Sequence, residues 1–147
     1  MDGRIVVGVD GSQSSRRALH WAAGQAKLTG ASLEVVNCWE IPSVEPSDLP
    51  LASTFGDDVR RNLQETITEV LGDEPGVEIT VSAVEGRAAP ALLDAARGAS
   101  LLVVGSRGHA AFTGMLLGSV SEHCVRHAPC PVVVVRGEDD HDRGGSG

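Results

Sequence analysis

The sequence predicts an α/β domain built on an open, five-stranded parallel β-sheet with four helices distributed over both faces. Short apolar segments rich in β-branched residues alternate with amphipathic segments along most of the 147-residue chain. This alternation is typical of consecutive strand–helix–strand units. Residues 1–137 therefore form one predicted domain, and the polar residues 138–147 form a predicted disordered tail.

The first elements follow from hydrophobic patterning. Arg4–Val9 is a nearly continuous apolar run, as expected of a strand that is buried on both faces. A helix follows, because alanine and leucine recur at helical spacing between a candidate N-cap at Ser12 or Ser14 and a stop at Gly30. Ala31–Cys38 is then the second predicted strand.

The middle of the chain continues the alternation. Three prolines make residues 41–50 a loop, and Thr54–Leu71 is an amphipathic helix. Val77–Val84 alternates apolar and polar residues, which predicts a strand near a sheet edge. Pro90 suits the first turn of the third helix, and Gly98 is expected to end it.

The last part contains two strands and a short helix. Leu101–Val104 reads as a buried strand, and a long glycine-rich connection, Gly105–Gly118, follows it. Ser119–His127 is a predicted helix, with Ser119 and Glu122 in the S-x-x-E spacing of a capping box. Pro131–Val135 is the final predicted strand.

Composition excludes several function classes. The net charge of −8 argues against a general nucleic-acid or anionic-membrane surface. The chain has no Tyr and only two Phe and two Trp, too few for a base-stacking platform. No apolar run approaches the ~20 residues that span a bilayer. The N-terminus lacks signal-peptide features and the three cysteines are an odd number, so we expect a cytoplasmic protein.

Two loops have unusual chemistry, and together they indicate where a ligand binds. Asp10–Ser12 follows the first strand, and Gly105–Gly118 follows the fourth. In open α/β sheets, ligands bind at the carboxyl ends of the strands, where the strand order reverses. The two loops become neighbours if the strand order is 3-2-1-4-5, and we therefore predict that order.

The glycine-rich connection has the features of a polyphosphate cradle. Gly105 and Gly108 would turn the backbone N–H groups of residues 106–111 inward as an anion nest. Gly118 would open the following helix, whose first turn offers unpaired N–H groups and a positive dipole end. Lys27 is the only lysine, so this is no Walker A loop, and no G-x-G-x-x-G follows the first strand.

The motif G-x2-G-x9-G-(S/T) is matched by Gly105, Gly108, Gly118 and Ser119. With VVGVDGS near the start, PALLDAA in the third helix and H-x-x-C-P-V-V-V-V near the end, the chain resembles the universal stress protein family over residues 4–136. The glycine spacing is that of the members that bind ATP.

The resemblance implies a bound adenine nucleotide, ATP with Mg²⁺. Asp10 would lie beside the ribose or the metal-bound phosphates, Gly8 would line the floor, and the backbone near Cys38 would meet the adenine edge. Met115 stands where many members carry a basic residue, which removes one charge contact. The residues implied around the ribose and phosphates are Gly105, Ser106, Arg107, Gly108, His109, Ala110, Ala111, Gly118, Ser119, Val120 and Ser121.

Three functions stay open at this point. The first is a nucleotide-binding regulatory protein of the stress response. The second is a slow ATP hydrolase using Asp10 and Mg²⁺; the segment Ser106–Leu117 contains no Asp, Glu or Lys, which argues against a fast enzyme. The third is a ligand-free interaction module.

Two further patterns carry expectations of their own. A bare edge at Val132–Val135 would invite pairing, so we expect a homodimer through antiparallel edge pairing, which the resemblance also implies. His123, Cys124, His127 and Cys130 have spacings that suggest a metal site, but we interpret them as packed residues.

Overall fold

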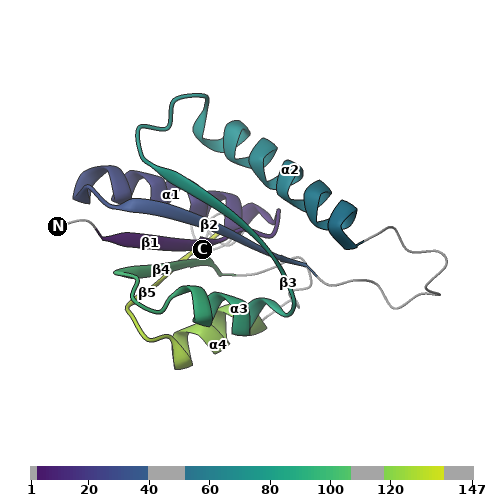
Figure 1. Ribbon diagram of the computed structural model, residues 1–147. Coiled ribbons are helices and arrows are strands. Elements are labelled where there is room, and N and C mark those ends of the chain that lie inside the picture. The colour runs from purple at the N-terminus through teal and green to yellow at the C-terminus, as the bar shows by residue number, and fades with distance from the viewer. Residues whose placement is uncertain (1–2, 40–51, 107–117, 138–147) are drawn as a thin grey trace, which may run out of the picture.

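The computed structural model describes residues 3–39, 52–106 and 118–137 and confirms the predicted fold class. Its five parallel strands lie in the order β3-β2-β1-β4-β5, with α1 and α2 on one face and α3 and α4 on the other (Figure 1). The elements are β1 (Arg4–Gly8), α1 (Gln13–Thr29), β2 (Ser32–Trp39), α2 (Ala52–Leu71), β3 (Ile79–Glu85), α3 (Ala88–Ala95), β4 (Leu101–Gly105), α4 (Ser119–His127) and β5 (Val132–Val135).

The strand order reverses at the centre of the sheet. β1 pairs with β2 on one side, where Val7 lies opposite Val35, and with β4 on the other, where Val7 lies opposite Val103. β3 and β5 form the two edges, which confirms the edge position expected for the alternating segment. The carboxyl ends of β1 and β4 are therefore neighbours, with the loops predicted to hold the ligand directly after them.

Each face of the sheet has its own hydrophobic core. Side chains of successive strand residues point to opposite faces, so Val7 belongs to the core under α1 and α2, and Val6 to the core under α3 and α4. Both are fully buried, as are Leu19 and Leu102. Each such side chain contributes about 1.5–3 kcal/mol, which explains why β1 and β4 read as continuous apolar runs.

Helix α1 begins and ends as its sequence indicates. The Ser12 side chain accepts a hydrogen bond from the Ser15 N–H, so Ser12 is the N-cap and Ser14 lies buried inside the first turn. Gly30 closes the helix in the left-handed region (φ 76°) and donates its N–H to the Ala26 carbonyl.

The predicted bounds of α4 are confirmed, but its predicted capping box and the predicted end of α3 are wrong. The N-cap of α4 is Gly118, without a side-chain cap bond, so Ser119 is the first helical residue and the capping box with Glu122 does not form. The Gly118 carbonyl accepts the Glu122 N–H and so makes the first hydrogen bond of the helix. α3 ends at Ala95 rather than at Gly98, because the chain tightens there into i→i+3 turns.

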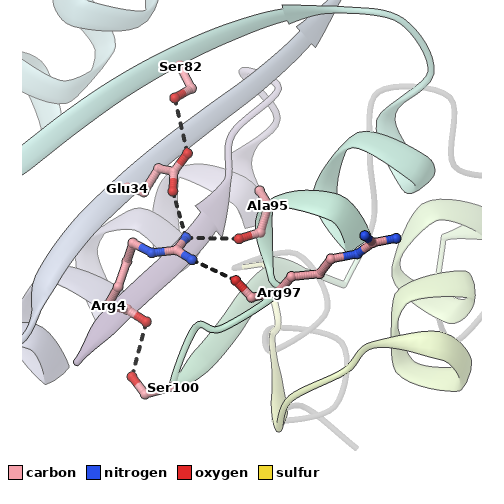
Figure 2. A network of polar contacts seen from close by, with 6 residues as sticks. All are labelled: Arg4, Glu34, Ser82, Ala95, Arg97 and Ser100. Atoms are coloured by element: carbon pink, nitrogen blue, oxygen red, sulfur yellow. Dashed lines mark hydrogen bonds and ion pairs between the residues drawn. The ribbon is translucent and has the colours of Figure 1, made fainter.

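A polar network anchors α3 at the amino ends of the strands (Figure 2). The Arg4 guanidinium pairs with Glu34 at 2.7 Å and donates to the carbonyls of Ala95 and Arg97, both at 2.8 Å. Ser82 donates to the other Glu34 oxygen at 3.1 Å, which extends the network to β3. Arg4 thus satisfies carbonyls at the end of α3 that lack helical partners.

In the parts of the chain that the structure describes, no helix is both long and apolar enough to cross a bilayer. The predicted proline loop and the predicted polar tail lie outside the described residues.

Candidate functional site

The carboxyl ends of β1 and β4 form the centre of the candidate site. Two helices start beside them, α1 three residues after Asp10 and α4 at the far end of the glycine-rich connection. Two helix N-termini at one edge bring several backbone N–H groups without helical partners to the same place. This is the arrangement that the strand-order argument predicts.

Asp10 lies exposed in the turn between β1 and α1. Its Oδ1 accepts the Ser12 N–H at 2.9 Å, and its own N–H points to the Ser15 hydroxyl oxygen at 3.2 Å. The carboxylate therefore shapes the turn, with Gly11 in the left-handed region (φ 88°). Because Asp10 is exposed, the same carboxylate is also accessible to a cation in solution.

Gly105 has a different role from the one its sequence context suggests. It is the last residue of β4 and is not among the glycines with positive φ. A Cβ at this position would lie 2.5 Å from Ser14 Oγ and 2.8 Å from both Ser14 C and Ser15 N. The missing side chain thus lets the first turn of α1 pack directly on β4, and it does not serve to turn the backbone.

Gly8 plays a comparable part on the other face. A Cβ there would lie 3.0 Å from both terminal methyl carbons of Leu92, so the glycine lets α3 approach the end of β1. Gly8 is half-buried at the carboxyl end of the strand. Its role as the floor of the site, which the resemblance implies, stays a prediction.

The two ends of the glycine-rich connection are held side by side. Ser106 is buried, donates its N–H to the Val135 carbonyl at 2.8 Å and accepts the Gly118 N–H on its own carbonyl at 2.6 Å. The Ser121 hydroxyl donates to the Gly105 carbonyl. The end of β4 and the start of α4 therefore lie at nearly the same point.

The first turn of α4 has the chemistry of an anion-binding element. Ser119 is exposed, while Ser121 is buried and uses its hydroxyl proton on the protein. What Ser121 can offer a ligand is its backbone N–H, together with those of Ser119 and Val120, because these first-turn groups have no intrahelical acceptor. The helix dipole adds a positive partial charge at the same place.

Cys38 lies at the end of β2, on the face covered by α3. Its Sγ lies 3.9 Å from the Ala88 carbonyl oxygen at the start of α3. Burial, and secondarily the nearby Cys124 thiol, raises the pKa of Cys38 to about 11. The thiol is therefore protonated at neutral pH and a poor nucleophile.

Asn37 is a residue of this region that was not predicted. Its side-chain amide donates to the Val9 carbonyl at 2.6 Å and so ties β2 to the segment that follows β1. A polar amide inside the apolar run of β2 is the signal in the sequence that could have identified this position. Asn37 stabilises the path of the chain towards Asp10.

The remaining predicted residues cannot be placed in the same way. Arg107, Gly108, His109, Ala110, Ala111 and Met115 lie outside the described residues, so their contacts stay predictions.

The proposed packing role of the His and Cys set is only half correct. Cys124 is fully buried in the core under α3 and α4, and Cys130 packs against it. His123 and His127 are exposed instead. In the described ranges 3–39, 52–106 and 118–137, no group of three or more His, Cys, Asp or Glu side chains could hold a metal ion.

A hollow lies at the opposite, amino ends of the strands and is less suited to a ligand of defined charge. It has a volume of about 420 Å³ and a lining that includes Lys27, Gly30, Gly76 and Glu78. Its charged side chains have both signs, and Arg4, which also lines it, is already paired with Glu34. The carboxyl edge therefore remains the candidate site.

Comparisons with known proteins agree with this fold. The chain is 33% identical to a universal stress protein of Mycolicibacterium smegmatis, over 94% of this chain and 50% of the relative. This chain spans about half the length of the curated relatives it matches.

Two solved structures give the same picture. One, from the universal stress protein family of Burkholderia pseudomallei, is 33% identical, with a TM-score of 0.67 over 90% of this chain and 95% of that chain. The other is a universal stress protein in complex with cAMP, 27% identical, with a TM-score of 0.68 over 92% of this chain and 98% of that chain. The model of the universal stress protein family matches residues 1–136, and the chain therefore belongs to that family.

Proposed function

We propose that this chain binds ATP with Mg²⁺ at the carboxyl ends of β1 and β4, and that nucleotide occupancy regulates its partners in a stress response. The observation that carries the proposal is the joining of Ser106 to Gly118 at 2.6 Å, which sets the first turn of α4 beside the end of β4. A relative with 27% identity was solved in complex with cAMP, which supports an adenine nucleotide as the ligand class.

The described residues fit a magnesium-bound triphosphate. Phosphate oxygens suit the N–H groups of Ser119, Val120 and Ser121, which point along the helix axis without intrahelical acceptors. Mg²⁺ prefers oxygen ligands and is commonly bound by one or two carboxylates together with phosphates. Asp10 offers such a carboxylate, exposed and fixed in direction by its bond from the Ser12 N–H.

The charge of the chain explains why these local donors matter. With a net charge of −8, the protein does not attract a polyphosphate at long range. Affinity must then come from short-range hydrogen bonds and from the cation that partly neutralises the phosphates. We accordingly expect binding to depend on Mg²⁺ and to weaken when Mg²⁺ is removed by chelation.

A substitution at the helix start tests the location of the site. Gly118→Glu places a negative side chain at the N-cap of α4, and we expect it to weaken Mg-ATP binding by about tenfold or more, ~1.4 kcal/mol. Isothermal titration calorimetry on the purified chain measures this change. Mass spectrometry of gently purified protein should also show co-purified adenine nucleotide.

The matched control carries the same chemical change elsewhere. Gly24 lies exposed in α1, and a Cβ there would meet nothing within 4 Å. Gly24→Glu adds the same charge and should leave the affinity unchanged. If Gly118→Glu binds Mg-ATP as tightly as Gly24→Glu, the nucleotide binds elsewhere. A wild-type chain that does not bind Mg-ATP would refute the proposal. Phosphate release should stay near the buffer level.

A further inference from the structure

Helix α4 exposes two histidines one turn apart. The ring centroids of His123 and His127 lie 4.6 Å from each other, with the ring planes inclined by 45°. Residues four apart are neighbours on a helix surface, so both rings project from the same face. Neither ring is needed for the core, because α4 buries Ser121 and Cys124 instead.

The chemistry of the pair narrows what it can bind. Neutral imidazole nitrogens suit Ni²⁺, Cu²⁺ and Zn²⁺, whereas Mg²⁺ and Ca²⁺ select oxygen ligands. The described part of the chain offers no group of three or more ligating side chains, so such a site has two protein ligands and water in its other positions. We propose that His123 and His127 chelate a late first-row divalent transition metal ion across the last turn of α4.

The electrostatic surroundings favour a cation at this place. The carboxyl end of a helix carries a negative partial charge, and His127 is the last residue of α4. Glu122 and Arg126 each directly precede one of the two histidines, and their opposite charges balance. The site is also distinct from the proposed nucleotide site, which uses the opposite end of the same helix.

Chelation should stabilise the folded chain. α4 has only nine residues, too few for a helix that is stable by itself. A metal ion that links His123 to His127 binds only when the last turn is helical, so it raises the unfolding temperature. We expect a rise of about 3 °C or more at saturating Ni²⁺.

Titration of the untagged chain with Ni²⁺ tests the proposal without any nucleotide. Ni²⁺ is the suitable probe because, unlike Cu²⁺, it does not oxidise the three free thiols. His123→Ala and His127→Ala should each weaken Ni²⁺ binding by about tenfold or more. Loss of a group that only supports a metal ligand already costs about this much, and loss of the ligand itself should cost at least as much. His20→Ala removes an exposed histidine of α1 and should change nothing.

A relocation variant tests the spacing itself. His123→Gln combined with Val125→His keeps the number of histidines but puts them two residues apart, on different faces of the helix. Val125 is 48% exposed, so the change leaves the core intact. Loss of Ni²⁺ binding in this variant supports chelation across one turn. Ni²⁺ affinity equal to wild type in this variant, or in both alanine variants, overturns the proposal.

Discussion

Cys124 shows how one buried side chain makes stability depend on pH. It is fully buried between α4 and the sheet, and burial raises the pKa of its thiol from 9.0 to about 11. The folded chain therefore holds this proton more tightly than the unfolded chain. As the pH rises from 9 towards 11, the unfolded state loses the proton first, and the free energy of unfolding falls.

We predict that this effect lowers the free energy of unfolding by about 2 kcal/mol near pH 11, because one pKa unit corresponds to ~1.4 kcal/mol. Urea unfolding of the reduced chain at several pH values above 8 measures it. Cys124→Ala removes the thiol, so the gap in stability between wild type and variant should narrow as the pH rises. Parallel pH profiles of the two proteins would contradict the prediction.

At the scale of the element, the contact between α1 and β4 gives the sharpest test of packing. Gly105→Ala would place a methyl group within 2.8 Å of two backbone atoms of α1, and backbone cannot rotate away as a side chain can. We predict a loss of about 1–3 kcal/mol in the free energy of unfolding, the usual cost of overpacking.

Denaturant unfolding of Gly105→Ala checks this value against a matched variant. Gly24→Ala makes the same chemical change inside α1, where nothing lies within 4 Å of the new carbon. It should raise stability by about 0.5–1 kcal/mol, since alanine is the better helix former. A Gly105→Ala variant as stable as wild type would mean that α1 is not pressed against β4.

Local signals were sufficient for the elements and insufficient for their contacts. β1 and β4 could be predicted because a strand buried on both faces reads as a run of β-branched residues. Helix α1 has its N-cap at Ser12, one of the two predicted N-caps, and ends at Gly30 as predicted, since caps act within a few residues. The role of Gly105 was misjudged, because it depends on Ser14, which is distant in sequence and adjacent only in the fold.

The candidate site shows the same difference between local signals and tertiary contacts. Its location followed from two unusual loops and the rule that open sheets bind ligands where strand order reverses. The predicted capping box at Ser119 does not form because Gly118, held beside β4, is the N-cap of α4. Its carbonyl accepts the Glu122 N–H. Tertiary contacts of this kind leave no pattern in the sequence around them.

At the scale of the whole molecule, the two edges of the sheet differ. Arg60 of α2 donates to the Val81 carbonyl of β3 at 3.0 Å, which occupies part of that edge. β5, at the other edge, is four valines long and half-buried along its length. An edge strand with free backbone groups is a template for pairing with another chain.

The alternation along β5 identifies which groups face outward. The carbonyls of Pro131 and Val135 accept N–H groups of Leu102 and Ser106, at 2.9 and 2.8 Å, from the β4 side. Backbone N–H and C=O groups alternate in direction along a strand, so those of Val132 and Val134 point away from β4. A second copy of the chain could pair with these groups in an antiparallel arrangement.

We predict a homodimer through this edge and a specific way to break it. Val134→Pro removes an outward N–H while leaving the bonds to β4 in place, a position where an edge strand tolerates proline. Val134→Ala trims the same side chain but keeps the N–H. Light scattering after size exclusion should give twice the 15.2 kDa chain mass for wild type and Val134→Ala, and a monomer for Val134→Pro. A dimeric proline variant, or a monomeric wild type, would show that β5 does not form the interface, since the alanine variant keeps the backbone donor that the proline variant lacks.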